Sequence, residues 1–172
     1  DVDVQWVGVM GFSAGGHVAA SASVLHSHSD HQQVIQDDVS GMATRPNFTV
    51  LLYPVISMTS FRHDGSVRAL LGPDPSPQLL QRLSLVAHIT NTTPPAFLWH
   101  PQEDQVVAVE NSLLYADALA AHSVENHLYV TEYGWHGMGS ELHHVTLPWV
   151  HEVQQWLYRL ARDNARAQWV SE

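Results

Sequence analysis

The chain has 172 residues and a mass of 19.1 kDa, which favours a single domain. Hydrophobic residues make up 45% and charged residues 14%, a composition typical of a folded globular protein and not of a disordered one. The formal net charge is −10, and the seven basic residues are all Arg and scattered, so nucleic acids and anionic membranes are poor candidate partners.

The sequence also bears on targeting and on cysteine chemistry. No apolar run approaches the roughly 20 residues that a membrane-spanning helix needs. The first five residues lack the basic and then apolar pattern of a secretory signal. Cysteine is absent, which excludes disulfides, thiolate nucleophiles and cysteine metal sites. The compartment and the oligomeric state stay open.

Short apolar runs alternate with helical patterns, which is typical of parallel strands joined by crossover helices. Strands are expected at residues 6–10, 49–53, 96–100 and around 127–130. Helices are expected at residues 16–25, at 110–121 and from Pro148 onward, where apolar residues recur at helical spacing. The pattern therefore predicts one α/β domain over residues 1–172.

Residues 57–93 depart from this alternation. Two short helical pieces, at 66–71 and 77–83, are separated by a stretch rich in glycine and proline. We expect this segment to be an excursion from the sheet that shapes a pocket.

The first predicted strand is apolar on both faces, as a strand inside a sheet would be. If the four strands lie in sequence order, its outer edge is bare, and folded proteins avoid long apolar edges. We therefore expect an upstream segment or a partner to cover it.

Residues 11–15 form a G-x-S-x-G motif directly after the first predicted strand and before a predicted helix. In that context the motif predicts a nucleophile elbow, a sharp turn that presents the hydroxyl of Ser13. Strained backbone angles are expected at the serine, and crowding around the turn favours glycine at positions 11 and 15. The N–H of Ala14 would be a natural oxyanion donor. The alternative is a glycine-rich turn that only closes the corner between strand and helix.

A serine nucleophile needs a base, and the base needs a carboxylate that orients it. In α/β sheets such groups are expected in loops at the carboxyl ends of the strands. Asp104 follows the third predicted strand, with Glu103 as its rival and an ordinary turn carboxylate as the alternative. His136 follows the fourth strand, in a loop whose glycines let the imidazole reach over the serine.

The chain contains thirteen His residues, so the others need an interpretation. His17 lies one helical turn after Ser13, and we expect a buried, hydrogen-bonded histidine there. His143 and His144 compete with His136 but have no glycine hinge. The cluster at residues 26–31 contains metal-ligating side chains, but without a cysteine or a preformed geometry we interpret it as a solvated helix end.

Six separated motifs, in the same order along the chain, together resemble one family. They are G-V-M-G-F-S-A-G-G-H at 8–17, R-P-N-F-T-V-L-L-Y-P-V-I-S at 45–57, H-D-G-S-V-R-A-L-L-G at 63–72, T-P-P-A-F-L-W-H at 93–100, V-E-N-S-L at 109–113 and G-W-H-G-M-G at 134–139. The sequence is similar, over nearly its whole length, to the α/β-hydrolase esterases related to acetyl xylan esterases and feruloyl-esterase-like carbohydrate esterases.

The resemblance implies a three-layer α/β-hydrolase fold with a mostly parallel sheet, and a serine carboxylester hydrolase. Ser13 would be the nucleophile, His136 the general base and then acid, and Asp104 the carboxylate that orients it. Such enzymes remove small acyl groups, commonly acetyl, from sugars or simple esters, without a metal or organic cofactor. The expected partner is therefore a small ester or an acylated carbohydrate. Trp135 would line the substrate pocket or pack in the core.

The sequence departs from the family in two ways. Ala108 stands where a proline is usual, and we expect this difference to be harmless. Trp135 stands where glycine is more frequent, and we expect it to narrow or reshape the pocket. The likeness also covers only the carboxyl-terminal half of the family's domain. The amino-terminal strands and an H-G-G-type loop with a second oxyanion N–H are missing, so we expect a partial domain with impaired activity. A peptidase or other hydrolase on the same triad, and a catalytically silent module, are the alternatives.

Overall fold

The computed structural model of the chain describes residues 6–25, 45–138 and 147–170. Its centre is a parallel sheet whose strands lie in chain order: β1 (Gly8–Phe12), β2 (Phe48–Leu52), β3 (Ala96–Pro101) and β4 (Asn126–Thr131). Phe12 pairs with Leu52, Leu52 with Trp99, and Trp99 with Tyr129. The carboxyl ends of all four strands therefore meet at one edge of the sheet, where loops from different strands can bring side chains together.

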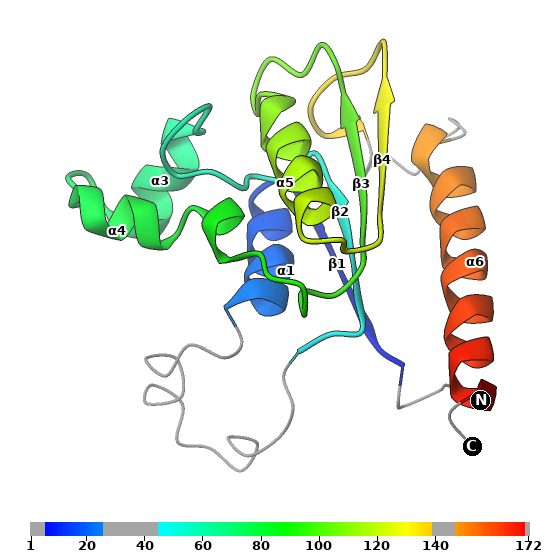
Figure 1. Cartoon of the computed structure of the whole chain (residues 1–172). Helices are drawn as coiled ribbons and strands as arrows, with labels where there is room; N and C mark the ends of the chain where they lie inside the picture. The colour runs from blue at the N-terminus through cyan, green and yellow to red at the C-terminus, as the bar shows by residue number, and fades with distance from the viewer. Residues whose placement is uncertain (1–5, 26–44, 139–146, 171–172) are drawn as a thin grey trace.

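Helices cover both faces of the sheet (Figure 1): α1 (Ser13–Val24) and α5 (Glu110–Ala121) on one, and α6 (Pro148–Val170) on the other. Successive side chains of each strand point to opposite faces of the sheet and so pack against different helices. Leu51 and Leu98 are buried in a cluster with residues of α1 and α5. Leu52 and Trp99 are buried in a second cluster with Trp156 of α6. The predicted α/β architecture is confirmed.

The boundaries of the first strand and the first helix differ from those that the sequence predicts. β1 ends at Phe12 and α1 begins at Ser13, whereas a strand at 6–10 and a helix from residue 16 were expected. The shift arises because no loop separates the two elements: pairing with β2 continues through Phe12, and α1 begins at the next residue. By contrast, α5 covers the predicted range, and Trp99 is a buried core residue as expected.

The segment between β2 and β3 leaves the sheet as an excursion (Figure 1). It contains α3 (Asp64–Leu71), α4 (Pro77–Arg82) and a 3₁₀ helix, η1 (Leu85–His88), which the sequence pattern did not predict. Ser76 caps α4 by accepting from the Leu79 N–H, and Pro77 occupies the first helical position. A small core of Val55, Met58, Val67 and Val107 joins this excursion to the loop that follows β3.

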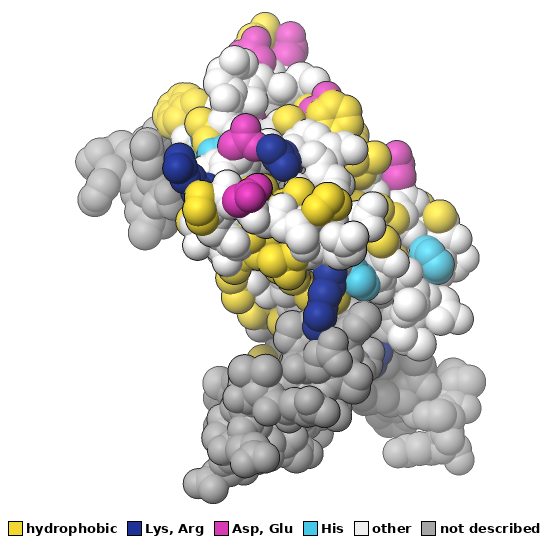
Figure 2. Space-filling view, turned by 90° about the vertical axis from the view of Figure 1, so that its left-hand side faces the viewer, with side chains coloured by type: hydrophobic (Ala, Val, Ile, Leu, Met, Phe, Trp, Pro, Cys, Tyr) yellow, Lys and Arg dark blue, Asp and Glu magenta, His cyan; other side chains and the backbone are white. Residues whose placement is uncertain are grey.

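The surface of the described residues shows how the sheet edge and the charges are arranged. β1 lies at the outer edge of the sheet, and the nearby side chains of Val7 and Met10 are exposed. On the face that carries α3 and α4, a few Arg side chains are interspersed with acidic and apolar ones (Figure 2). Within the described ranges, no helix combines the length and the apolar character needed to cross a bilayer.

Candidate active site

The elbow at the end of β1 holds Ser13 in a strained backbone conformation. Its φ is 54°, in the left-handed region that non-glycine residues rarely adopt. The Val55 N–H donates to the Ser13 carbonyl at 3.0 Å, so the segment after β2 secures the turn from the side. Strain of this kind persists only where the surroundings enforce it, and it concentrates at functional sites.

The two motif glycines differ in the space around them. A Cβ at Gly11 would lie 2.1 Å from the Gly15 carbonyl oxygen, so only glycine fits there. A Cβ at Gly15 would meet nothing within 4 Å among the described residues. The expectation of crowding at both positions is thus confirmed for Gly11 and wrong for Gly15. The second crowded glycine is Gly16, whose Cβ would lie 2.6 Å from that of Pro54.

This difference predicts opposite effects of the same substitution. Gly11→Ala should lower the free energy of unfolding by about 3 kcal/mol, because the clashing atom is backbone and cannot rotate away. Gly15→Ala should raise it by about 0.5 kcal/mol, since alanine is the better residue inside a helix. Urea denaturation of this chain at pH 7 measures both values. Equal losses in the two variants would contradict the steric account.

The loop after β4 carries His136 over the elbow. Gly134 and Gly137 flank it with φ values of 149° and 91°, so the expected glycine hinges are present. A Cβ at Gly134 would lie 2.8 Å from the Cβ of Pro101, which shows how closely this loop packs on the end of β3. The Tyr53 ring packs against the imidazole of His136, with 4.8 Å between the two ring centroids.

The loop after β3 presents Asp104 with its side chain fully buried. Its Oδ1 accepts from the Val106 and Val107 N–H groups at 2.9 Å each, and its Oδ2 accepts from His136 Nδ1 at 2.7 Å. Burial alone would raise the pKa of Asp104. The hydrogen bonds from His100, His136 and the two backbone N–H groups outweigh it and hold the pKa well below its usual range. The carboxylate is therefore ionised at neutral pH.

The hydrogen-bond partners determine where the protons lie. An ionised carboxylate can only accept, so His136 Nδ1 must carry a proton and donate it to Asp104. The neutral ring then has a lone pair on Nε2, which lies 2.7 Å from Ser13 Oγ and accepts the hydroxyl proton. The arrangement leaves the serine hydroxyl poised to lose its proton to the imidazole as Oγ attacks an electrophile.

The other candidate residues are placed as follows. Glu103, the rival of Asp104, is exposed. Ala14 is the second residue of α1, and Trp135, directly before His136, is about half exposed. His143, His144 and the cluster at 26–31 lie outside the described residues. In the described part, no group of three or more His, Asp or Glu side chains is arranged to hold a metal ion.

His17 is buried, as expected, but neither ring nitrogen has a hydrogen-bond partner among the described residues. The expected burial is confirmed, and the expected hydrogen bond stays a prediction, because the one nearby group in the described part that acts on the ring is the Val55 backbone. Burial lowers the pKa of His17, and the nearby Val55 backbone opposes this only in part.

The lowered pKa of His17 predicts a pH effect. In the unfolded chain the His17 imidazole takes up a proton near pH 6.5, whereas in the folded protein it does so only at lower pH. Protonation therefore favours the unfolded chain, and the free energy of unfolding decreases as the pH falls through that value. Between about pH 7.5 and 5.5 the free energy of unfolding should fall less steeply in His17→Leu than in the wild type. Denaturant titrations at several pH values test this, and parallel curves would contradict it.

Sequence reasoning missed several polar residues that build the site. Asn111 is fully buried in the first turn of α5; its carbonyl oxygen accepts from the Ile56 and Ser57 N–H groups, and its amide donates to Phe61 and Ala108 carbonyls. His100 and Ser112, also fully buried, bond to each other next to Asp104. The available signal was a histidine at the carboxyl end of an otherwise apolar strand.

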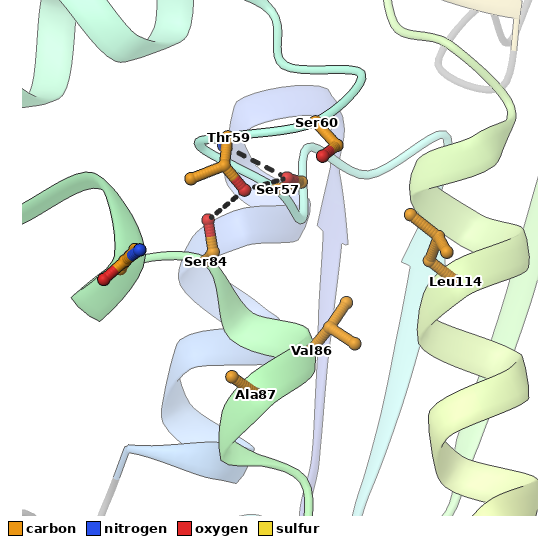
Figure 3. Close-up of a pocket in the computed structure, with 8 residues that line it drawn as sticks. Ser57, Thr59, Ser60, Ser84, Val86, Ala87 and Leu114 are labelled. Atoms are coloured by element: carbon orange, nitrogen blue, oxygen red, sulfur yellow. Dashed lines mark hydrogen bonds between the residues drawn. The ribbon is translucent and has the colours of Figure 1, made fainter. Parts of the chain in front are cut away.

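A hollow of about 420 Å³ lies between the excursion and α5 (Figure 3). Hydrogen-bonded hydroxyls of Ser57, Thr59 and Ser84 line one part of it, and Leu114 points toward it from α5. Most of its lining belongs to the excursion, but Ser13, Asp104 and His136 are not among the lining residues.

Comparison with known proteins gives a consistent result. Residues 1–119 match the BD-FAE family model. The chain is 38% identical over 138 residues to endo-1,4-beta-xylanase B of Butyrivibrio fibrisolvens. The matched segment covers 80% of this chain and 21% of that protein. It is 34% identical over 138 residues to an acetylxylan esterase of Xylanibacter ruminicola, covering 77% of this chain and 26% of that protein.

Solved structures share the fold. An acetyl ester-xyloside bifunctional hydrolase from Caldicellulosiruptor lactoaceticus superposes with a TM-score of 0.80 and 40% identity, over 90% of this chain and 56% of the other. The carboxylesterase Cest-2923 from Lactobacillus plantarum WCFS1 superposes with a TM-score of 0.73 and 26% identity. That match covers 93% of this chain and 60% of the other. The chain spans about a quarter or less of the curated relatives and somewhat over half of these structures. It belongs to the BD-FAE family and has the fold of the α/β-hydrolase esterases.

Proposed function

We propose that the chain carries the nucleophile, the base and the orienting carboxylate of a serine carboxylester hydrolase that removes small acyl groups, acetyl foremost. The observation that supports this most strongly is the unbroken chain of contacts, 2.7 Å from Ser13 Oγ to His136 Nε2 and 2.7 Å from His136 Nδ1 to Asp104 Oδ2. In each of these hydrogen bonds, the proposed donor and acceptor are the ones that the reaction requires.

The reaction follows from these positions. Ser13 Oγ attacks the ester carbonyl while His136 Nε2 takes the hydroxyl proton, and Asp104 stabilises the imidazolium that results. His136 then gives that proton to the departing alcohol oxygen, leaving an acyl group on Ser13. Water then attacks the acyl-enzyme while His136 takes a proton from it, and His136 gives that proton to Ser13 Oγ as the carboxylic acid departs.

The oxyanion is stabilised by the N–H of Ala14, in our proposal. Ala14 lies in the first turn of α1, where backbone N–H groups have no acceptor within the helix and the helix dipole favours negative charge. The second donor assigned by the resemblance, an H-G-G-type loop, does not occur in this sequence.

Acetylated sugars are the substrate class that the relatives support, since one is an acetylxylan esterase and another an acetyl ester-xyloside hydrolase. The exposed indole of Trp135, next to the base, could stack on a sugar ring. We therefore propose Trp135 as a substrate contact that serves the sugar and not the acyl group.

A substrate panel tests the proposed function. The full-length protein is assayed with p-nitrophenyl acetate, butyrate and octanoate, with acetylated xylo-oligosaccharides and with a peptide p-nitroanilide. We expect kcat/KM to be highest for the acetyl esters and to fall with acyl length, and we expect no anilide hydrolysis. Turnover of the anilide above that of every ester would instead indicate a peptidase.

Trp135→Ala should raise KM for acetylated xylo-oligosaccharides about three- to tenfold, because a stacking contact is lost. KM for p-nitrophenyl acetate should stay within about twofold, since that substrate has no sugar ring. Trp135→Phe should restore most of the affinity. Tyr158→Ala, on the exposed face of α6, is the control. An equal rise in KM for both substrates would contradict sugar stacking.

A further inference from the structure

His100 is a fully buried imidazole near the carboxyl end of β3, outside the three residues of the proposed reaction. Buried polar groups are retained where their hydrogen bonds are made. Both ring nitrogens of His100 have partners: Nδ1 lies 2.8 Å from Ser112 Oγ, and Nε2 lies 2.9 Å from the Val107 carbonyl oxygen. The ring is therefore held at two points on two different elements.

These partners leave one arrangement of protons for the neutral ring. The Val107 carbonyl can only accept, so Nε2 carries the proton and donates it. Nδ1 is then an acceptor, and the Ser112 hydroxyl donates to it. Ser112, fully buried in the first turn of α5, thus fixes both the ring and its proton.

The protonated nitrogen of His100 also faces the proposed catalytic carboxylate. Nε2 lies 3.4 Å from Asp104 Oδ2, which is the oxygen that accepts from His136. Val107 closes the arrangement, because its N–H donates to Asp104 Oδ1 while its carbonyl accepts from His100. Asp104, Val107 and His100 therefore form a closed ring of contacts around the carboxylate.

We infer that His100, held by Ser112, is a positioning residue: through Val107 and Asp104 Oδ2 it fixes the carboxylate in line with His136. This inference rests on the proposed function, since His100 acts only through Asp104. It also explains how a loop outside the regular elements can hold a carboxylate accurately: the imidazole ties the loop to the rigid strand β3 and to α5.

Two amide substitutions separate positioning from mere space filling. The amide of His100→Gln reaches the place of Nε2 and can still donate toward Val107 and Asp104. The amide of His100→Asn ends near the place of Nδ1, so it keeps the Ser112 contact and loses the donor. The assay uses the protein as its gene encodes it, and active sites are counted with a fluorophosphonate so that unfolded molecules do not lower kcat.

We expect His100→Asn to lower kcat for p-nitrophenyl acetate about tenfold with KM within about twofold, because the carboxylate loses its alignment. His100→Gln should restore kcat to within about threefold of the wild type. In an Asp104→Asn background, His100→Asn should have no further effect on kcat. His127→Gln, on neighbouring β4, is the control and should leave kcat unchanged.

Equal kcat per active site in the Asn and Gln variants would overturn the inference, as would an effect of His100→Asn that persists in the Asp104→Asn background. If the His100 variants do not fold, Ser112→Ala decides: an unchanged kcat overturns the inference, and a loss of about threefold supports it. A failure of the proposed function gives a different result: either the wild type hydrolyses no ester at all, or Ser13→Ala still hydrolyses the ester and takes up the fluorophosphonate.

Discussion

Ser13→Ala is expected to lower kcat for p-nitrophenyl acetate by about a thousandfold or more, because alanine has no oxygen to form the acyl-enzyme. The fold should be unaffected, since alanine keeps the Cβ and the backbone contact to Val55. Initial rates under saturating substrate measure the loss, and far-ultraviolet circular dichroism checks the fold.

Ser21→Ala is the matched control, since it makes the same chemical change in the same helix, two turns from the elbow. It should leave kcat unchanged. If Ser13→Ala keeps more than about a tenth of the wild-type rate, Ser13 is not the nucleophile.

Asp104→Asn is expected to lower kcat about 10³- to 10⁴-fold with little change in the fold. The asparagine amide can donate to His136 Nδ1, which moves the imidazole proton to Nε2 and leaves no acceptor for the Ser13 hydroxyl. In the wild type, the lowered pKa of Asp104 keeps the carboxylate ionised at neutral pH, so the titration of this group does not limit activity there.

Glu103→Gln changes the neighbouring exposed carboxylate in the same way and serves as the control. Its kcat should equal that of the wild type. A kcat for Asp104→Asn within tenfold of the wild type would show that another group orients His136.

The layered fold could be predicted because buried parallel strands and amphipathic helices leave strong patterns. β3 is wholly buried, and the strand at 96–100 was predicted from its apolar character. The end of β1 was predicted two residues too early and the start of α1 three residues too late, because periodicity does not show that a strand passes into a helix without a loop. The short η1 was missed because four residues are too few to display a helical period.

The principal site residues could be proposed because their chemistry is tied to position. A serine between glycines at a strand-to-helix turn, and polar groups after the next strands, are expected at one edge of a parallel sheet. The structure brings both Ser13 and Asp104 within hydrogen-bond distance of His136, one at each ring nitrogen. Their roles in a reaction remain proposals that the substitutions above test.

The supporting residues could not be predicted, because their partners come from distant parts of the chain. His100 depends on Ser112 in another element, and Asn111 bonds to backbone groups more than 50 positions earlier. Tyr53 has a φ of 37° and packs on His136, yet its sequence context indicates only the end of a strand. Such contacts follow from the packing of α5 and the excursion around the loop that carries Asp104.

The most direct test of the central claim is the position of a covalent adduct. The protein as its gene encodes it is treated with a fluorophosphonate, digested, and analysed by fragmentation mass spectrometry. Because the imidazole activates one hydroxyl, we expect a single phosphonyl group on Ser13 and none in the Ser13→Ala variant. An adduct on another residue, or ester hydrolysis that continues with Ser13 unlabelled, would contradict the account.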